Sequence, residues 1–235
     1  MKIKSFYNLL PFNTGSDKKE DNIPWPIVVE KLPNCKTVTE LGCGTGWLSS
    51  RIKKRFPDII VKGIDISKTA ISQANSRSED IEFVVDDLTS YKQKADMIIS
   101  MGVLHHIPNY DIKELMTHTI NLSNKYTFIG LYHKNSRKAM FDFFDLYPVH
   151  KRKNLFKKMT PQIKDEEQRL SWYRDQFENP FEQTTTLEVF RDIAKSTQTN
   201  LIYSNIQSDN TYDDAMARLN TYEFISGFIY GVFEK

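Results

Sequence analysis

The stretch TELGCGTGW, residues Thr39–Trp47, decides the fold of this chain. It joins a short β-branched run, Lys36–Leu41, to a segment with apolar residues at four-residue spacing (Leu48, Ile52 and Phe56). The run predicts a β-strand, and the spacing predicts a helix. The glycines of the turn between them permit positive φ angles and let a ligand approach the backbone closely. A strand, a glycine turn and a helix in this order indicate a ligand-binding α/β fold.

Strand and helix signals then alternate as far as residue 132. Apolar runs predict further strands, and helical patterns fall between them: strands Ile59–Ile66, Ile81–Val85, Asp96–Met101 and Tyr126–Tyr132, and helices Thr69–Ser76, with Ser67 as N-cap, and Asp111–Leu122. This repeated β-α-β order predicts a parallel sheet that is covered by helices on both faces.

The alternation stops at residue 133. Residues 133–183 contain no convincing strand, and they predict two or three helices inserted after the fifth strand. The pattern resumes at Thr185, predicted as an N-cap that forms a capping box with Glu188 and opens the helix Thr186–Lys195. A last group of elements completes seven strands: strand Asn200–Ile206, helix Asp213–Asn220 and strand Tyr222–Phe233.

The spacing of the glycines restricts the ligand. A dinucleotide-binding turn would place a glycine at position 47, where this chain has Trp47, and the Gly-Lys-Ser/Thr of a Walker loop is absent. What remains is an acid, Glu40, followed by glycines at 42, 44 and 46. Asp65 ends the second predicted strand, where a carboxylate can accept hydrogen bonds from both hydroxyls of a ribose.

These residues resemble motif I of the class I methyltransferases, and the resemblance covers most of the chain. It implies a seven-stranded Rossmann-like sheet, the cofactor S-adenosyl-L-methionine and the product S-adenosyl-L-homocysteine. It also implies that Glu40 lies near the positively charged methionine portion of the cofactor. At the end of the third strand, the resemblance implies an acid that accepts from the adenine amino group; by register with Phe83 this is Asp87, and Asp86 is the alternative. The predicted cofactor-binding residues are Glu40, Gly42, Cys43, Gly44, Gly46, Trp47, Asp65, Ile66, Asp87, Leu88 and Met101.

The segment SMGVLHHIP, residues 100–108, follows the fourth strand. It resembles the segment that lines the methyl-transfer site of many small-molecule methyltransferases. Methyl transfer is an in-line displacement, and a base assists when the acceptor must lose a proton. Histidine suits this role because its ordinary pKa is about 6.5. The candidates are His106 first, His105 second and His133 third.

The inserted segment is predicted to cover the acceptor. GLYHKNSR (130–137) and SWYRDQFENPFE (171–182) are similar to a bacterial small-molecule-type subgroup of methyltransferases with a DQ-aromatic-x-x-P-x-E segment. The predicted acceptor-binding residues are Tyr132, His133, Trp172, Asp175, Gln176 and Glu182. The alternative is that Asp175, Gln176 and Glu182 only hold the insert together by hydrogen bonds and salt bridges. Lys134–Lys158 carries eight basic residues against two acidic ones, which indicates either a solvated helix face or an anionic small-molecule acceptor.

The predicted organisation has four parts: an N-terminal helical or lid segment (1–35), a cofactor-binding half (36–133), a helical acceptor cap (134–184) and the C-terminal part of the α/β domain (185–235). Pro24-Trp25-Pro26 precedes a predicted helix, Ile27–Leu32, which either folds over the cofactor as a lid or packs against the core.

The composition narrows the class of protein. A net charge of +2 does not require a polyanionic partner, so nucleic acid is not expected. No run approaches the ~18 apolar residues of a membrane span, and two cysteines are too few for a disulfide framework, so we expect a cytoplasmic protein. No metal is expected, and the oligomeric state stays open. The alternatives are an RNA or protein methyltransferase, a non-catalytic S-adenosylmethionine-binding regulator, and an NAD-dependent oxidoreductase, against which Trp47 argues.

Overall fold

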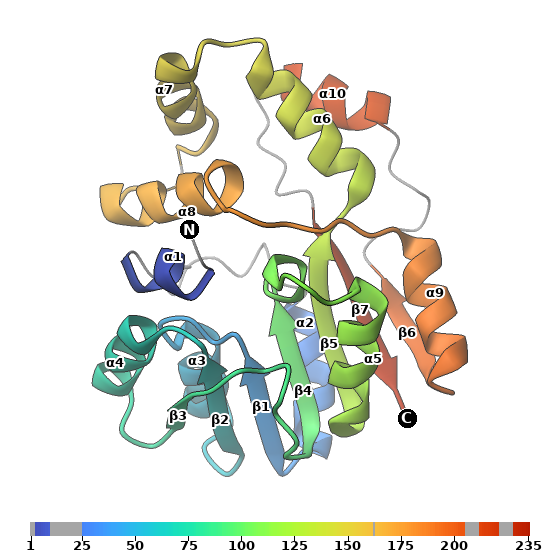
Figure 1. Cartoon of the computed structure of the whole chain (residues 1–235). Coiled ribbons are helices and arrows are strands. Elements are labelled where there is room, and N and C mark those ends of the chain that lie inside the picture. The colour runs from blue at the N-terminus through green and yellow to red at the C-terminus, as the bar shows by residue number, and fades with distance from the viewer. Residues whose placement is uncertain (1–2, 10–24, 162, 205–211, 221–227) are drawn as a thin grey trace.

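The computed structural model describes residues 3–9, 25–161, 163–204, 212–220 and 228–235. Its centre is a seven-stranded sheet with the strand order β3-β2-β1-β4-β5-β7-β6 (Figure 1). The strands are β1 (Thr37–Leu41), β2 (Ile60–Asp65), β3 (Glu82–Val85), β4 (Ala95–Met101), β5 (Ser123–Tyr132), β6 (Asn200–Ser204) and β7 (Phe228–Glu234). The pairs among β1 to β5 are parallel, as the alternation of strands and helices predicts.

Helices cover both faces of the sheet, which confirms the α/β architecture. On one face lie α2 (Trp25–Lys31), α3 (Trp47–Arg55) and α4 (Lys68–Arg77), whose buried apolar side chains share a core with β1 to β5 and β7. On the other face lie α5 (Ile112–Asn121) and α9 (Leu187–Ser196). Short 3-10 turns occur at η1 (Leu32–Asn34) and η2 (Leu104–His106). Ser67 caps α4 as predicted, because its Oγ accepts from the Ala70 N–H at 3.2 Å.

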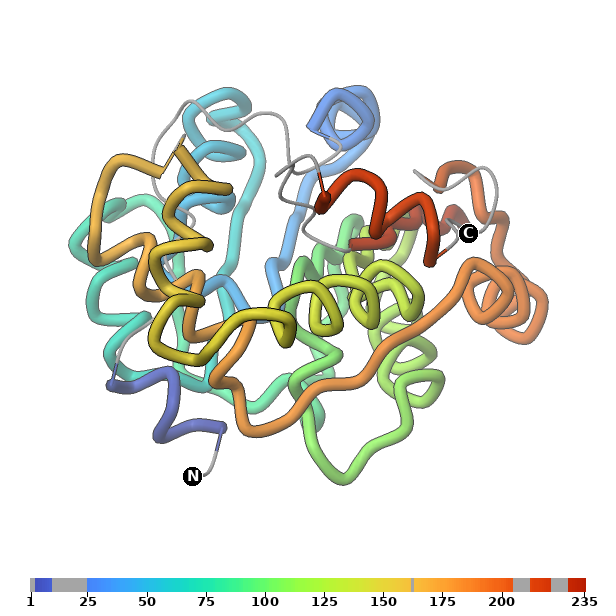
Figure 2. Tube along the Cα trace, turned by 90° about the horizontal axis from the view of Figure 1, so that it is seen from above, coloured from blue at the N-terminus to red at the C-terminus, as the bar shows by residue number. Residues whose placement is uncertain are grey.

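A cap of helices lies above the carboxyl ends of the strands (Figure 1). It consists of α6 (Lys134–Asp145), α7 (Val149–Met159) and α8 (Glu166–Phe177), which confirms the predicted helical insertion, and α10 (Tyr212–Asn220) packs against it. Seen from above, the cap runs across the sheet from α6 to α8 (Figure 2). The cap has its own apolar core, which includes Phe144, Phe156, Trp172 and Leu219.

Strand β7 departs from the predicted parallel sheet, since it pairs antiparallel with both β5 and β6. The cause is the position of α10, whose Ala215 and Leu219 are buried in the cap core. Because α10 lies at the carboxyl end of the parallel strands, β7 begins at that end and runs opposite to β5. Residues 205–206 and 222–227 of the predicted strands lie outside the described residues.

The predicted capping box at Thr185 is wrong. Thr186 is the N-cap of α9, and its side chain makes no capping hydrogen bond. Thr185 instead forms an isolated parallel bridge with His133: its N–H donates to the Tyr132 carbonyl at 2.9 Å, and its carbonyl accepts from the Lys134 N–H at 2.9 Å. The chain thus enters and leaves the cap side by side.

The N-terminal helices take different places. The predicted helix Ile27–Leu32 is α2, which begins at Trp25 and packs against the sheet, so this segment is core and not a lid; Pro24 lies outside the described residues. A separate helix, α1 (Ile3–Leu9), lies between α4 and the cap (Figure 1). Among the described residues, none of the helices is both long enough and apolar enough to cross a membrane.

Candidate functional site

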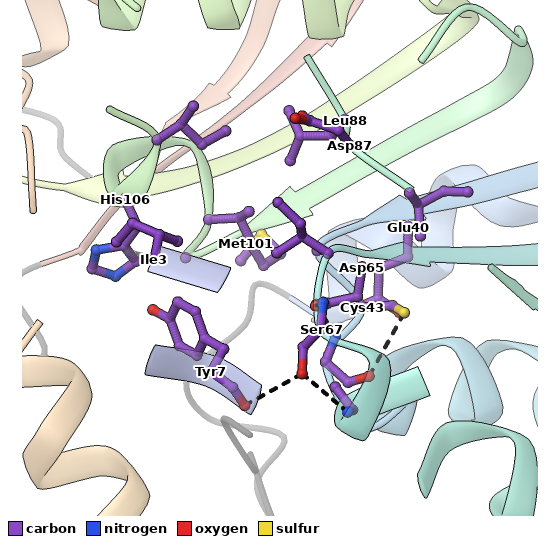
Figure 3. A pocket seen from close by; sticks show the side chains of 18 of the residues that line it. Ile3, Tyr7, Glu40, Cys43, Asp65, Ser67, Asp87, Leu88, Met101 and His106 are labelled. Atoms are coloured by element: carbon purple, nitrogen blue, oxygen red, sulfur yellow. Dashed lines mark hydrogen bonds between the residues drawn. The ribbon is translucent and has the colours of Figure 1, made fainter. Parts of the chain in front are cut away.

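One pocket of about 410 Å³ lies between the strand ends and the cap. In Figure 3, Glu40, Cys43 and Asp65 lie on one side of it, and Ile3, Tyr7 and His106 lie on the other. We call these the cofactor side and the acceptor side. Every predicted cofactor-binding residue except Gly46 lines the pocket.

The glycine turn has the backbone that its sequence predicts. Gly42 and Gly46 have φ angles of 76° and 77°, a region that favours glycine. A Cβ on Gly42 would lie 2.3 Å from the Val103 side chain, and one on Gly46 would lie 2.7 Å from the Phe83 ring. Gly46 therefore serves the packing of the turn against β3, which explains why it does not line the pocket.

Asp65 is half-buried and is already engaged by backbone donors. Its Oδ2 accepts from the Gly44 N–H at 2.8 Å, and its Oδ1 accepts from the Ser67 N–H at 2.8 Å. Burial raises the pKa of Asp65, while these hydrogen bonds act in the opposite direction. The carboxylate that was predicted for a ribose thus also ties the glycine turn to the start of α4.

Glu40 is buried at the start of the glycine turn. One of its oxygens, Oε2, accepts from Ser49, at 3.0 Å from the backbone N–H and 2.5 Å from the hydroxyl. Burial raises the pKa of Glu40 to about 8, against the opposing effect of the Ser49 hydrogen bonds. A cationic ligand beside this carboxyl group would favour its ionised form.

Glu40→Gln is expected to change how stability depends on pH. An exposed glutamate has a pKa of about 4.3, so between that value and about 8 the folded state holds a proton that the unfolded state has lost. The Glu40 contribution to the free energy of unfolding therefore falls as pH rises through this window, by on the order of 1 kcal/mol per pH unit, and then levels. Urea denaturation of both proteins from pH 5 to pH 8 measures the difference. Parallel curves would contradict the assignment.

The adenine acceptor is predicted among two neighbouring acids of the cofactor side. Asp86 and Asp87 both line the pocket. Asp87 accepts from the Thr89 N–H at 2.9 Å and from the Thr89 hydroxyl at 2.8 Å. The assignment of the adenine acceptor to Asp87 therefore stays a prediction. Trp47 lines the pocket, and the Arg77 guanidinium lies 3.7 Å from the centroid of its ring.

On the acceptor side, His106 is held by three groups. Its Nδ1 lies 3.1 Å from the Phe181 carbonyl, and its Nε2 lies 3.0 Å from His105 Nε2 and 3.4 Å from Asp175 Oδ1. A carbonyl only accepts, so Nδ1 of His106 carries a proton. His105 accepts from the Tyr132 N–H at its Nδ1, 3.3 Å away, so its own proton is on Nε2 and points at His106. Nε2 of His106 is thus left with the lone pair.

Asp175 is a buried carboxylate with several donors. The Tyr7 hydroxyl donates to Oδ1 at 2.6 Å, and the Tyr132 hydroxyl donates to Oδ2 at 3.0 Å. Burial acts to raise the pKa of Asp175, but His106 in its protonated form and the hydrogen bonds from the two tyrosines outweigh burial and lower the pKa. Asp175 is therefore ionised at neutral pH and faces the pocket beside His106.

Tyr7 is a site residue that the sequence does not single out. Helix α1 is held at both ends of this site: the Ser67 hydroxyl donates to Asn8 Oδ1 at 2.9 Å, and Asn179 Nδ2 donates to the Tyr7 hydroxyl at 2.9 Å. Helix α1 thereby joins the start of α4 to the end of α8. A seven-residue helix near the N-terminus carries no motif, so only its docking reveals its role.

Several predicted catalytic and acceptor-binding residues do not line the pocket. His105 lies behind His106 and stacks on the Tyr132 ring, with centroids 3.8 Å apart, and burial lowers its pKa well below the ordinary value. His133 is buried, with its Nδ1 3.4 Å from the Ser136 hydroxyl. Trp172 belongs to the cap core. Tyr132 does not line the pocket but contacts two residues that do: its hydroxyl donates to Asp175, and its ring lies edge-on to His106, with centroids 5.5 Å apart.

Gln176 and Glu182 surround a buried guanidinium. Arg137 Nε donates to both Glu182 oxygens at 3.0 Å, and its Nη1 donates to Gln176 Oε1 at 2.7 Å. The guanidinium also lies 4.1 Å from the centroid of the Tyr132 ring. This geometry supports the alternative that these two polar residues hold the cap together.

In comparisons with known proteins, this chain is similar to methyltransferases. Residues 38–124 match the methyltransferase domain family. The trans-aconitate 2-methyltransferase of Escherichia coli is 34% identical over 95 residues, which are 40% of this chain. The chain spans 37% of the length of that relative.

Solved structures agree with the fold. The magnesium protoporphyrin IX methyltransferase of Synechocystis PCC 6803, with bound S-adenosylmethionine, has a TM-score of 0.58 at 13% identity; the alignment covers 99% of this chain and 95% of that one. The plantazolicin methyltransferase BpumL has a TM-score of 0.53 at 16% identity, with 93% and 87% covered. Residues 38–124, which carry the glycine turn and the acids at the ends of parallel strands, are thus the part of this chain that is similar to a methyltransferase domain.

Proposed function

We propose that this protein transfers the methyl group of S-adenosylmethionine to a small-molecule acceptor. The observation that carries the proposal is one continuous pocket, in which the glycine turn and Asp65 lie on one side and His106 and Asp175 lie on the other. The cofactor supplies a methyl group on a sulfonium, which is already activated, so alignment of the acceptor is the main task of the protein. The cap covers the strand ends, and this favours an acceptor that fits inside the pocket.

The residues of the cofactor side fit this cofactor. Asp65 lies at the end of β2, where a carboxylate can bind ribose hydroxyls, and the buried Glu40 offers a negative charge to the methionine portion. The glycine turn does not have the spacing of a dinucleotide-binding turn, because Trp47 occupies the position at which such a turn has glycine. His106 is the proposed base: its Nε2 holds the lone pair, which accepts from His105 at 3.0 Å, and the same atom lies 3.4 Å from Asp175, which lines the pocket. Protonation of that atom would replace the hydrogen bond from His105 by one to Asp175.

Calorimetric titration tests the cofactor class. S-adenosylhomocysteine is expected to bind, and NAD is not. Binding of NAD without binding of S-adenosylhomocysteine would overturn the proposal.

Asp65→Ala is expected to weaken binding of S-adenosylhomocysteine at least tenfold, which corresponds to about 1.4 kcal/mol. The substitution removes the ribose acceptor and also frees the Gly44 and Ser67 N–H groups. The melting temperature should therefore fall as well, and binding is measured well below it. Asp80→Ala, at an exposed position before β3, is the matched control and should bind as the native protein does. Unchanged affinity in Asp65→Ala would remove Asp65 from the site.

A further inference from the structure

The charged side chains of the acceptor side indicate the chemical class of the acceptor. This side is lined by α1, the loop that starts with η2, and α8: Ile3, Tyr7, Val103, His106, Ile107, Pro108, Asn109, Tyr110 and Asp175. It holds one carboxylate, one histidine and, among the described lining residues, no lysine or arginine. The single arginine among the described lining residues is Arg51 on α3, the helix that follows the glycine turn, and its guanidinium lies 4.2 Å from the Trp25 ring centroid. Arg51 therefore belongs to the cofactor side.

The basic run of the cap does not supply a cation to the acceptor. Arg137 points into the cap, where it pairs with Glu182. The other basic residues of this run do not line the pocket, and several form ion pairs at the surface: Lys138 with Asp142, Arg152 with Asp145, Lys153 with Glu178, and Lys157 with Glu166. The geometry therefore favours the solvated-face interpretation of this run over an anionic acceptor.

A carboxylate or phosphate on the acceptor would be buried beside ionised Asp175, and the described residues of the acceptor side offer it no lysine or arginine, which is an unfavourable arrangement. An ammonium group would gain the opposite charge of Asp175. Tyr7 and Tyr110 also line the pocket, and aromatic rings attract cations. The pocket thus disfavours a negatively charged acceptor and favours a positively charged one.

We propose that the acceptor is an amine, bound as an ammonium group beside Asp175, and this inference rests on the proposed methyl transfer. The ammonium gives a proton to Nε2 of His106, whose new N–H donates to Asp175. The nitrogen lone pair forms a bond to the methyl carbon, and the electron pair of the broken carbon–sulfur bond remains on sulfur. The products are neutral S-adenosylhomocysteine and an N-methylammonium group, and the imidazolium then returns its proton to water.

Two of the residues that carry this inference lie outside the region of family similarity. The matched residues 38–124 include His106 but neither Tyr7 nor Asp175. The Escherichia coli relative is named for trans-aconitate, which is a polycarboxylate, and the alignment with it covers 40% of this chain. Similarity of the cofactor half is therefore compatible with a different acceptor charge here.

The test uses the full chain with methyl-labelled S-adenosylmethionine, once with a bacterial small-molecule extract and once with trans-aconitate alone. The expected product is retained by a cation exchanger and keeps its label in base, as an N-methylamine does. No labelling of trans-aconitate is expected. Label released by base as methanol would show a carboxyl ester, and a neutral base-stable product would show an ether. Either product, or no product from a protein that binds S-adenosylhomocysteine, would overturn the amine assignment. Failure to bind S-adenosylhomocysteine would instead overturn the proposed function.

A variant pair locates the effect. Asp175→Asn keeps the size of the side chain and removes its charge, so KM for the amine identified by labelling should rise at least tenfold, while the Kd of S-adenosylhomocysteine changes less than about twofold. Glu178→Gln, three residues further along at the exposed end of α8, should leave both values unchanged. Melting temperatures show whether each variant is folded. An unchanged KM in a folded Asp175→Asn protein would exclude Asp175 as the counter-ion.

Discussion

His106→Gln is expected to lower kcat by about 10² to 10⁴, the usual contribution of a general base. Glutamine has a similar size and can still hydrogen-bond to the Phe181 carbonyl, but it cannot take up a proton at neutral pH. Because His106 lies on the acceptor side, the Kd of S-adenosylhomocysteine should change less than about twofold. Label transfer to the amine measures kcat, and calorimetry measures Kd.

The control for this change is His150→Gln, at an exposed position on α7. It should leave kcat and Kd as they are in the native protein. Equal losses of turnover and of cofactor affinity in His106→Gln would show that the residue supports the pocket as a whole and does not accept the proton.

Arg137→Met is expected to lower the free energy of unfolding by about 3 kcal/mol, the lower end of the effect of breaking a buried ion pair. Arg137 is 1% exposed, and its removal leaves Glu182 and Gln176 without their donors. Glu182 is 22% exposed, so water can replace part of what it loses, which is why the lower value is expected. Urea denaturation monitored by circular dichroism measures the change.

Lys157→Met is the matched control, because Lys157 and its partner Glu166 are both more than half exposed. Exposed ion pairs contribute at most about 1 kcal/mol, so this variant should remain near the native stability. If both variants lose the same amount, the buried guanidinium has no special role in holding the cap.

The sheet as far as β5 could be predicted because each element is encoded locally. Strands such as β1 and β4 are short runs buried on both faces, and Ser67 marks the start of α4 with its own side chain. The direction of β7 could not be predicted in this way, since it depends on the packing of α10 against α6. Thr185 shows the same limit: its sequence favours a helix cap, but pairing with His133 outweighs that local preference.

The cofactor side and the acceptor side differ in how far the local sequence encodes them. The cofactor side is built from strand ends and one short turn, so its residues follow from motifs over a few positions. The acceptor side brings together Tyr7, His106 and Asp175 from three distant parts of the chain. The resemblance to methyltransferase segments made His106 and Asp175 candidates, but it did not identify Tyr7 or the pairing of Arg137 with Glu182. These contacts exist only after the cap and α1 have docked.

The bridge between His133 and Thr185 brings the start and the end of the cap to one point on the sheet. A segment whose two ends meet can be lengthened, shortened or exchanged with little strain on the structure that carries it. Natural variation in the helices between these two residues can therefore alter which molecules are methylated, while the strands below keep their register and the cofactor its place. The sheet and the cofactor side thus form the constant part of the molecule, and the helical cap forms the variable part.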